Sequence, residues 1–85
     1  MLHTYEDVLQ HIIGFLRNRL EGAPEIYKNS HLIKDLNVNS LLVFEIVEEL
    51  EVTYQIVVPL ELLYKEKIQT VAELANEVMR LTDKG

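Results

Sequence analysis

Apolar residues recur at three- and four-residue steps in three parts of the chain, which places their side chains on one face of an α-helix. This spacing predicts one helix from about Thr4 to Leu20, a second from Ser40 to about Tyr54, and a last one that starts at Thr70. A short helix is predicted after Pro59, because proline suits the first helical position. The positions predicted to be buried on the three longer helices are Tyr5, Val8, Ile12, Leu16, Leu20, Phe44, Val47, Leu50, Tyr54, Val71, Leu74, Val78 and Leu81.

Capping residues and helix breakers mark the ends of these helices. Thr4 can cap the first helix, and the sequence from Thr70 to Glu73 matches a capping box, in which two side chains bond each other's backbone amides. Gly22 and Pro24 end the first helix, since both residues interrupt a helical pattern.

Two connections carry mixed signals. Residues 21–39 form a long loop, in which we predict a short turn over residues 31–34 with Ser30 as a candidate cap. Residues 52–58 are rich in β-branched side chains and therefore favour a strand, but no comparable second strand exists to pair with them. We interpret them as the end of the second helix and an extended, partly buried connection. The sequence thus predicts an all-α fold, a small four-helix bundle forming a single domain over residues 1–85.

Composition limits the class of protein. A chain of 85 residues with 48% hydrophobic and 26% charged residues is typical of one globular domain. It contains no cysteine, which excludes disulfides and thiolate metal sites. No uncharged run is long enough to cross a bilayer, and no basic-then-apolar leader opens the sequence, so we expect a cytoplasmic protein.

Charge is unevenly distributed along the chain. The net charge of −6 disfavours nucleic acids and anionic membranes as partners. Six acidic residues and no Lys, Arg or His lie between residues 35 and 64, so this segment accounts for the whole net charge. It is either a solvated helix face or a docking surface for basic partners, and charge alone leaves both open.

Little in the sequence supports catalysis or metal binding. Ser40, His31 and Asp35 could be imagined as a hydrolase triad, but Ser40 lacks the flanking glycines of a nucleophile turn. His3 and His11 are eight residues apart, unlike metal-binding pairs four residues apart on one helix face. We therefore predict no catalytic residue and no metal site.

Ser40 lies where the long loop meets the acidic second helix. A serine there can cap the helix, but Asn39 can do so equally well. The alternative is an attachment point for a phosphate, because the amides and dipole at a helix N-terminus favour negative charge. Position alone does not decide between these roles.

The residues around Ser40 resemble the modification-site region of acyl carrier proteins. In that family a turn reading roughly D-L-G-x-D-S-L places the phosphopantetheine serine at the start of the second helix. The segments that carry the resemblance are His31–Leu41, Glu45–Leu50, Tyr54, Val58–Pro59 and Ile68–Val71. They cover most of the chain in the order of the family, so the resemblance implies a bundle of acyl-carrier type.

The resemblance also implies a function. Ser40, between Asn39 and Leu41, would carry a covalent 4′-phosphopantetheine from coenzyme A, added by a phosphopantetheinyl transferase. The arm would hold acyl or related intermediates as thioesters, and the carrier, a monomer, would catalyse nothing. Basic patches of acyl-loading and acyl-processing enzymes would dock on the acidic second helix. The residues implied for docking are Leu41, Glu45, Glu48 and Glu51, and those implied for an acyl pocket are Phe44, Val47, Leu63 and Ile68.

Three departures from the family pattern indicate a specialised carrier. Asn39 replaces the acid before the serine, which would slow modification or require a dedicated transferase. Asn37 replaces a glycine, and asparagine tolerates the left-handed backbone that this turn needs. Leu42 follows Leu41 where an acid is common, as in peptidyl carriers. The alternatives are therefore an aminoacyl or peptidyl carrier, or an unmodified helical adaptor. The sequence does not distinguish fatty acyl, polyketide and aminoacyl cargo.

Overall fold

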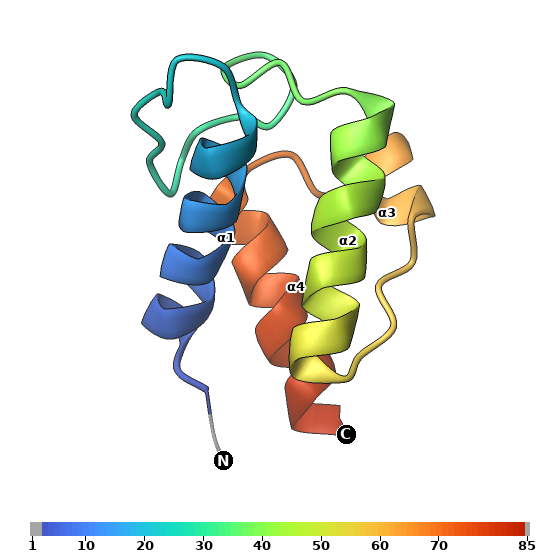
Figure 1. Ribbon diagram of the computed structural model, residues 1–85. Coiled ribbons are helices and arrows are strands. Elements are labelled where there is room, and N and C mark those ends of the chain that lie inside the picture. Colours follow the sequence, from blue (N-terminus) through green and yellow to red (C-terminus); the bar gives the residue numbers. More distant parts are fainter. Residues whose placement is uncertain (1–2, 85) are drawn as a thin grey trace.

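The computed structural model describes residues 3–84, and this part of the chain contains four helices (Figure 1). Their bounds are Tyr5–Arg19 for α1, Ser40–Tyr54 for α2, Glu61–Tyr64 for α3 and Val71–Lys84 for α4. Within residues 3–84 the only β-type pairing is one isolated bridge between His31 and Thr70. The predicted all-α architecture, with a long first loop and a short third helix, is confirmed. No helix in residues 3–84 has the length and apolarity needed to span a membrane.

The helices α1, α2 and α4 pack against one another around a common core, with α4 behind α1 and α2 in Figure 1. The short α3 lies beside the N-terminal half of α2. The largest fully buried side chains come from all three long helices and include most of the predicted stripe positions. These side chains are Val8, Ile12, Leu16, Leu50, Val71, Leu74 and Val78.

The prediction that Phe44 is buried was wrong, because its side chain is 52% exposed. The inner side of α2 is instead formed by Leu42, Val43, Ile46, Val47 and Leu50. These residues cover a broad side of the helix, which packs on α1 and α4. Phe44 lies outside this buried side of the helix and is exposed to solvent.

The helix boundaries follow the predicted caps. Thr4 Oγ1 accepts a hydrogen bond of 3.0 Å from the Asp7 amide at the start of α1. At the start of α4, Thr70 Oγ1 accepts from the Glu73 amide at 3.1 Å, and Glu73 Oε1 accepts from the Thr70 amide at 2.9 Å. The predicted capping box is therefore present.

The turn after residue 30 is organised by His31 rather than by the predicted cap, Ser30. His31 Nδ1 accepts hydrogen bonds from the amides of Ile33 and Lys34, at 3.1 and 3.0 Å. Ser30 is buried, and its Oγ accepts from the Tyr27 amide at 2.9 Å. Ser30 therefore supports the preceding bend of the chain.

Residues 55–58 form the predicted connection instead of a strand. The helix α2 ends at Tyr54, and the left-handed backbone of its C-cap, Gln55 (φ 55°), turns the chain into an extended segment. Glu51 Oε2 accepts a hydrogen bond of 2.9 Å from the Val58 amide and so ties this segment to α2. Pro59 lies just before α3 rather than at its first position, and its carbonyl accepts from the Leu62 amide.

Candidate functional site

The N-terminus of α2 is capped by Asn39, which leaves the hydroxyl of Ser40 out of the cap. Asn39 Oδ1 accepts a hydrogen bond of 2.9 Å from the Leu42 amide, and Ser40 is the exposed first residue of the helix. The first turn of α2 contains no acidic residue. The helix dipole at this end is thus not offset by a carboxylate of the same turn.

The loop before α2 adopts the backbone that the sequence predicts. Asn37 is left-handed, with φ 54°, at the place where the resemblance expects a glycine. Asparagine is among the residues that adopt this conformation most readily, so the turn forms without glycine. The turn brings the chain from the buried Leu36 and Val38 to the exposed Asn39 and Ser40.

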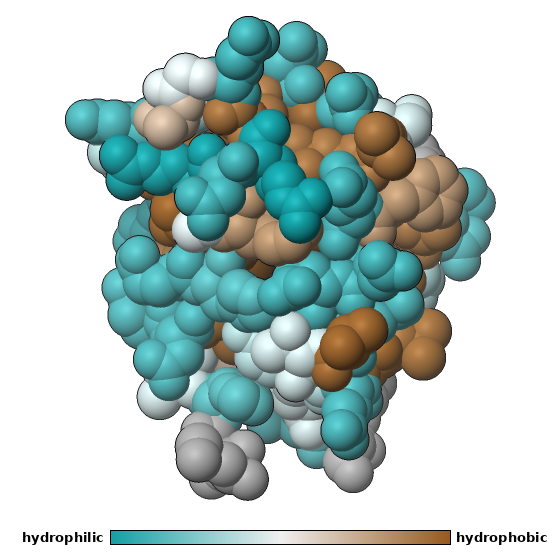
Figure 2. All heavy atoms as spheres, in the orientation of Figure 1, coloured by the Kyte–Doolittle hydropathy of each residue, from teal (hydrophilic) through white to brown (hydrophobic). Residues whose placement is uncertain are grey.

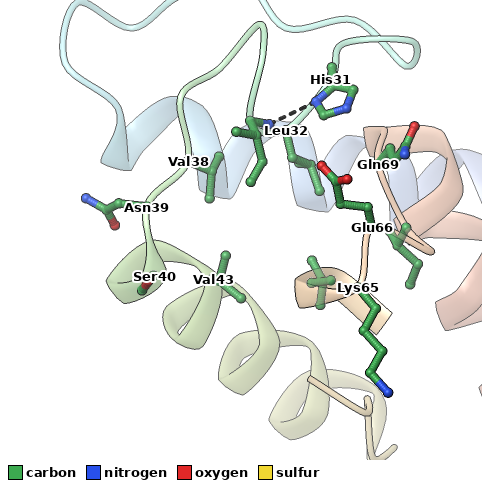
Figure 3. Close-up of a pocket in the computed structure, with 12 residues that line it drawn as sticks. His31, Leu32, Val38, Asn39, Ser40, Val43, Lys65, Glu66 and Gln69 are labelled. Atoms are coloured by element: carbon green, nitrogen blue, oxygen red, sulfur yellow. Dashed lines mark hydrogen bonds between the residues drawn. The ribbon is translucent and has the colours of Figure 1, made fainter. Parts of the chain in front are cut away.

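Ser40 lies at the edge of a hollow of about 550 Å³ between the start of α2, the preceding loop and the connection from α3 to α4. In Figure 3 Val43 of α2 and Val38 of the loop face this space, while Asn39 points away from it. The residues that line the hollow are His31, Leu32, Ile33, Val38, Asn39, Ser40, Val43, Leu63, Lys65, Glu66, Ile68 and Gln69. Its volume is within the usual range of ligand pockets.

The four residues expected to form an acyl pocket do not lie together. Leu63 and Ile68 line the hollow beside Ser40. Phe44 and Val47 line a second hollow of about 560 Å³, between α2 and the segment that leads into α3. The other residues that line the second hollow are Leu41, Glu45, Glu48, Glu51, Val58 and Leu60.

The acidic residues of α2 differ in their surroundings. Glu45 pairs with Arg19 at the end of α1, with 2.7 Å between Oε2 and Nη1. Glu49 Oε2 lies 2.8 Å from His11 Nε2. Glu51 Oε2 accepts the hydrogen bond from the Val58 amide described above. Within residues 3–84, the side chain of Glu48 has no hydrogen bond or ion pair, so its carboxylate is the freest of the four.

The histidines do not form a catalytic or metal-binding arrangement. His31 Nδ1 is occupied by two backbone amides, and Asp35 accepts from the His31 amide at 2.7 Å rather than from the ring. His11 Nδ1 lies 2.8 Å from the hydroxyl of Tyr54. Burial, and then the carboxylates of Asp7 and Glu49, raise the pKa of that hydroxyl above its usual value. No group of three or more metal-binding side chains is found among residues 3–84.

Several residues of these surfaces carry no signal in the sequence. Val38 and Val43 read as ordinary core positions, and Lys65 and Glu66 read as part of a linker. They meet at the hollow only because the loop before α2 and the connection after α3 fold toward each other. The sequence also offers no sign of the pair between Arg19 and Glu45, because the two residues are 26 positions apart in the chain.

A comparison with known protein families finds a match to the phosphopantetheine attachment site family over residues 7–78. No curated protein matches the chain. The match includes most of α1, all of α2 and α3 and the first part of α4, together with the turn before Ser40. The exposed serine hydroxyl and the hollow beside it are compatible with a covalent arm. The chain therefore belongs to the phosphopantetheine attachment site family and is a non-catalytic carrier protein with a covalent 4′-phosphopantetheine.

Proposed function

We propose that Ser40 carries the 4′-phosphopantetheine and that the protein moves acyl or related intermediates, as thioesters, between enzymes. The observation that supports this most strongly is the different placement of the chain's two serines. Ser30 is 8% exposed and its Oγ is engaged by the Tyr27 amide, whereas Ser40 is exposed at a helix N-terminus. A transferase needs a hydroxyl that it can reach, so Ser40 is the better acceptor.

The attachment step is a phosphoryl-type substitution. The Ser40 oxygen forms a bond to the phosphorus of the pantetheine phosphate, and the pyrophosphate bond of coenzyme A breaks. Adenosine 3′,5′-bisphosphate leaves, and the hydroxyl proton passes to a base of the transferase. The bound group then supplies a thiol for thioester formation. The first turn of α2, which has no acid, suits the charge of the phosphate.

The division of the apolar residues between two hollows gives them separate proposed roles. Leu63 and Ile68 share their hollow with Ser40, so we assign them to the shelter for the arm or its cargo. Phe44 and Val47 line the other hollow together with the docking candidates, so we assign them to the docking surface. The cargo in this proposal is an acyl group or a related acid, without a commitment to chain length.

Docking is proposed to occur on α2 around Leu41, with the transferase and the acyl-loading and acyl-processing enzymes as partners. Leu41 is 67% exposed and lies on the second hollow beside Glu45, Glu48 and Glu51. An apolar contact flanked by carboxylates fits a partner whose apolar side chain is flanked by Lys or Arg.

The experiment that tests the attachment is intact mass spectrometry after incubation with coenzyme A and a broad-specificity phosphopantetheinyl transferase. We expect the parent to gain the mass of one phosphopantetheine. Ser40→Ala should gain nothing, whereas Ser30→Ala, which changes the chain's other serine, should still be modified. Circular dichroism of each variant checks that the fold is retained.

Two outcomes would contradict the proposal. Modification of Ser40→Ala would place the arm elsewhere. If neither the parent nor an Asn39→Asp variant, which restores the family's acid, is modified, the unmodified adaptor is favoured. Modification of Asn39→Asp alone would keep Ser40 as the site and indicate a dedicated transferase for the parent.

A further inference from the structure

The ion pair between Arg19 and Glu45 joins the last residue of α1 to the middle of the acidic helix α2. Arg19 Nη1 donates to Glu45 Oε2 at 2.7 Å. The guanidinium also lies over the ring of Phe15, with its carbon 4.5 Å from the ring centroid. Arg19 therefore has two contacts, of which one is charged and the other is a cation–π contact within its own helix.

Glu45 belongs to two hollows at once. It lines the hollow that contains Leu41 and Phe44, and it also lines a smaller one, of about 180 Å³, with Phe15 and Arg19. Figure 2 shows hydrophilic atoms running across the face between α1 and α2, with hydrophobic patches beside them over α2. Glu45 is thus a proposed docking residue whose carboxylate already holds a base from the same chain.

The pair is accessible enough to exchange partners. The side chains of Arg19 and Glu45 are 46% and 37% exposed. Ion pairs in such positions contribute little to stability, because water solvates both charges and long side chains lose freedom when they are held together. An incoming guanidinium or ammonium group can therefore replace Arg19 at modest cost. The contact of Arg19 with Phe15 lies within α1 and does not involve Glu45, so opening the ion pair does not require its loss.

We propose that Arg19 occupies, in the free carrier, the place on Glu45 that a basic side chain of the docking partner takes in the complex. The inference rests on the docking surface of the proposed function and adds a competitor to it. The partner that fits is one with an Arg or Lys beside the apolar group that meets Leu41 and Phe44. Arg19 weakens the binding of every such partner and selects for those whose base competes well.

The alternative role for Arg19 is purely structural, as a link between α1 and α2. The two roles make opposite predictions when Arg19 is removed. A structural link would leave docking unchanged or impair it. A competitor would improve docking when lost, and only while Glu45 retains its charge.

The test measures the dissociation constant between the carrier and a broad-specificity phosphopantetheinyl transferase. All variants carry Ser40→Ala, so that binding is read without modification and independently of the attachment site. Arg19→Gln is compared with Arg17→Gln, which removes the same charge from the same turn of α1. Arg17 is exposed and has no ion pair within residues 3–84.

We expect Arg19→Gln to bind about two- to fivefold more tightly than Arg17→Gln, the range expected for release of an exposed ion pair. The difference should shrink at high salt, where exposed charges are screened. Adding Glu45→Gln should abolish the difference, because the carboxylate for which the two bases compete is gone.

Equal binding by Arg19→Gln and Arg17→Gln would overturn the inference, as would weaker binding by Arg19→Gln. A difference that persists in the Glu45→Gln background would also overturn it, since the effect would not pass through the pair. The absence of binding by all variants would overturn it as well, because the inference requires this enzyme to dock on α2. Failure of the attachment proposal is read separately, from intact mass.

Discussion

The starts of α2 and α4 solve the same problem in different ways. Every helix N-terminus exposes backbone amides that lack a partner within the helix. At α4 the chain supplies its own anion, because Glu73 Oε1 accepts from the amides of Gln69 and Thr70, both at 2.9 Å. At α2 the single cap from Asn39 is neutral, and no acid follows in the first turn.

The difference suits the roles proposed for the two helices. The amides at α4 stabilise the charged form of Glu73, and they lower the pKa of its carboxyl below the usual value. The N-terminus of α2 stays free of a competing carboxylate, beside the serine to which we assign the phosphate. A helix N-terminus can thus carry a charged capping box where it only has to be stable, or a neutral cap where a phosphate is to be attached.

Removing the capping box at the start of α4 should have the largest effect on stability. The double variant Thr70→Ala, Glu73→Ala removes both halves of the capping box, and we expect it to lower the free energy of unfolding by about 1–2 kcal/mol. Urea denaturation followed by circular dichroism measures this. A loss below a few tenths of a kcal/mol would mean that solvent replaces the box at no cost.

The stability that the capping box of α4 contributes should also depend on pH. Because the pKa of Glu73 is lowered on folding, its charge adds stability above the ordinary value of 4.5, and this is lost as pH falls through the lower folded value. Glu73→Gln keeps an oxygen acceptor but cannot titrate. The stability difference between parent and Glu73→Gln should therefore shrink below pH 4.5, whereas a constant difference would contradict the assignment.

At the start of α2, substitutions of the cap and of the attachment site should affect stability differently. We expect Asn39→Ala to cost about 1 kcal/mol of unfolding free energy, because the Leu42 amide loses its acceptor. Ser40→Ala should change stability by less than about 0.5 kcal/mol, because the exposed hydroxyl does not cap the helix. Equal losses in the two variants would show that Ser40 shares the capping role.

The phosphate itself is expected to stabilise the fold only slightly. Attachment at Ser40 should raise the free energy of unfolding by about 0.3–1 kcal/mol at low ionic strength, because a negative charge then lies at the positive end of α2. The gain should fade with added salt. Thermal melts of the unmodified and modified carrier at two salt concentrations check this, and a gain that ignores salt would point to contacts of the arm instead.

Local sequence was sufficient for the three long helices and their boundaries, but it placed the start of α3 too early, at Pro59. The capping box at Thr70 and Glu73 depends on residues three positions apart, and the left-handed turn at Asn37 depends on one side chain. The strand-like segment after Tyr54 was assigned correctly as a connection, because a strand needs a partner that the sequence lacks. Ser40 was likewise a candidate from the sequence, because of its place at a helix start and the resemblance of residues 31–41 to acyl carrier proteins.

The tertiary structure decided which groups meet. Helical periodicity gives the faces of α2 but not how many neighbours cover each face, which is why Phe44 was wrongly predicted to be buried. The split of the expected pocket into two hollows depends on the path of the segments around α3, and the pair of Arg19 with Glu45 depends on how α1 lies against α2. These contacts join residues far apart in sequence, and their energies are set by packing and solvent exposure, which a one-dimensional pattern does not contain.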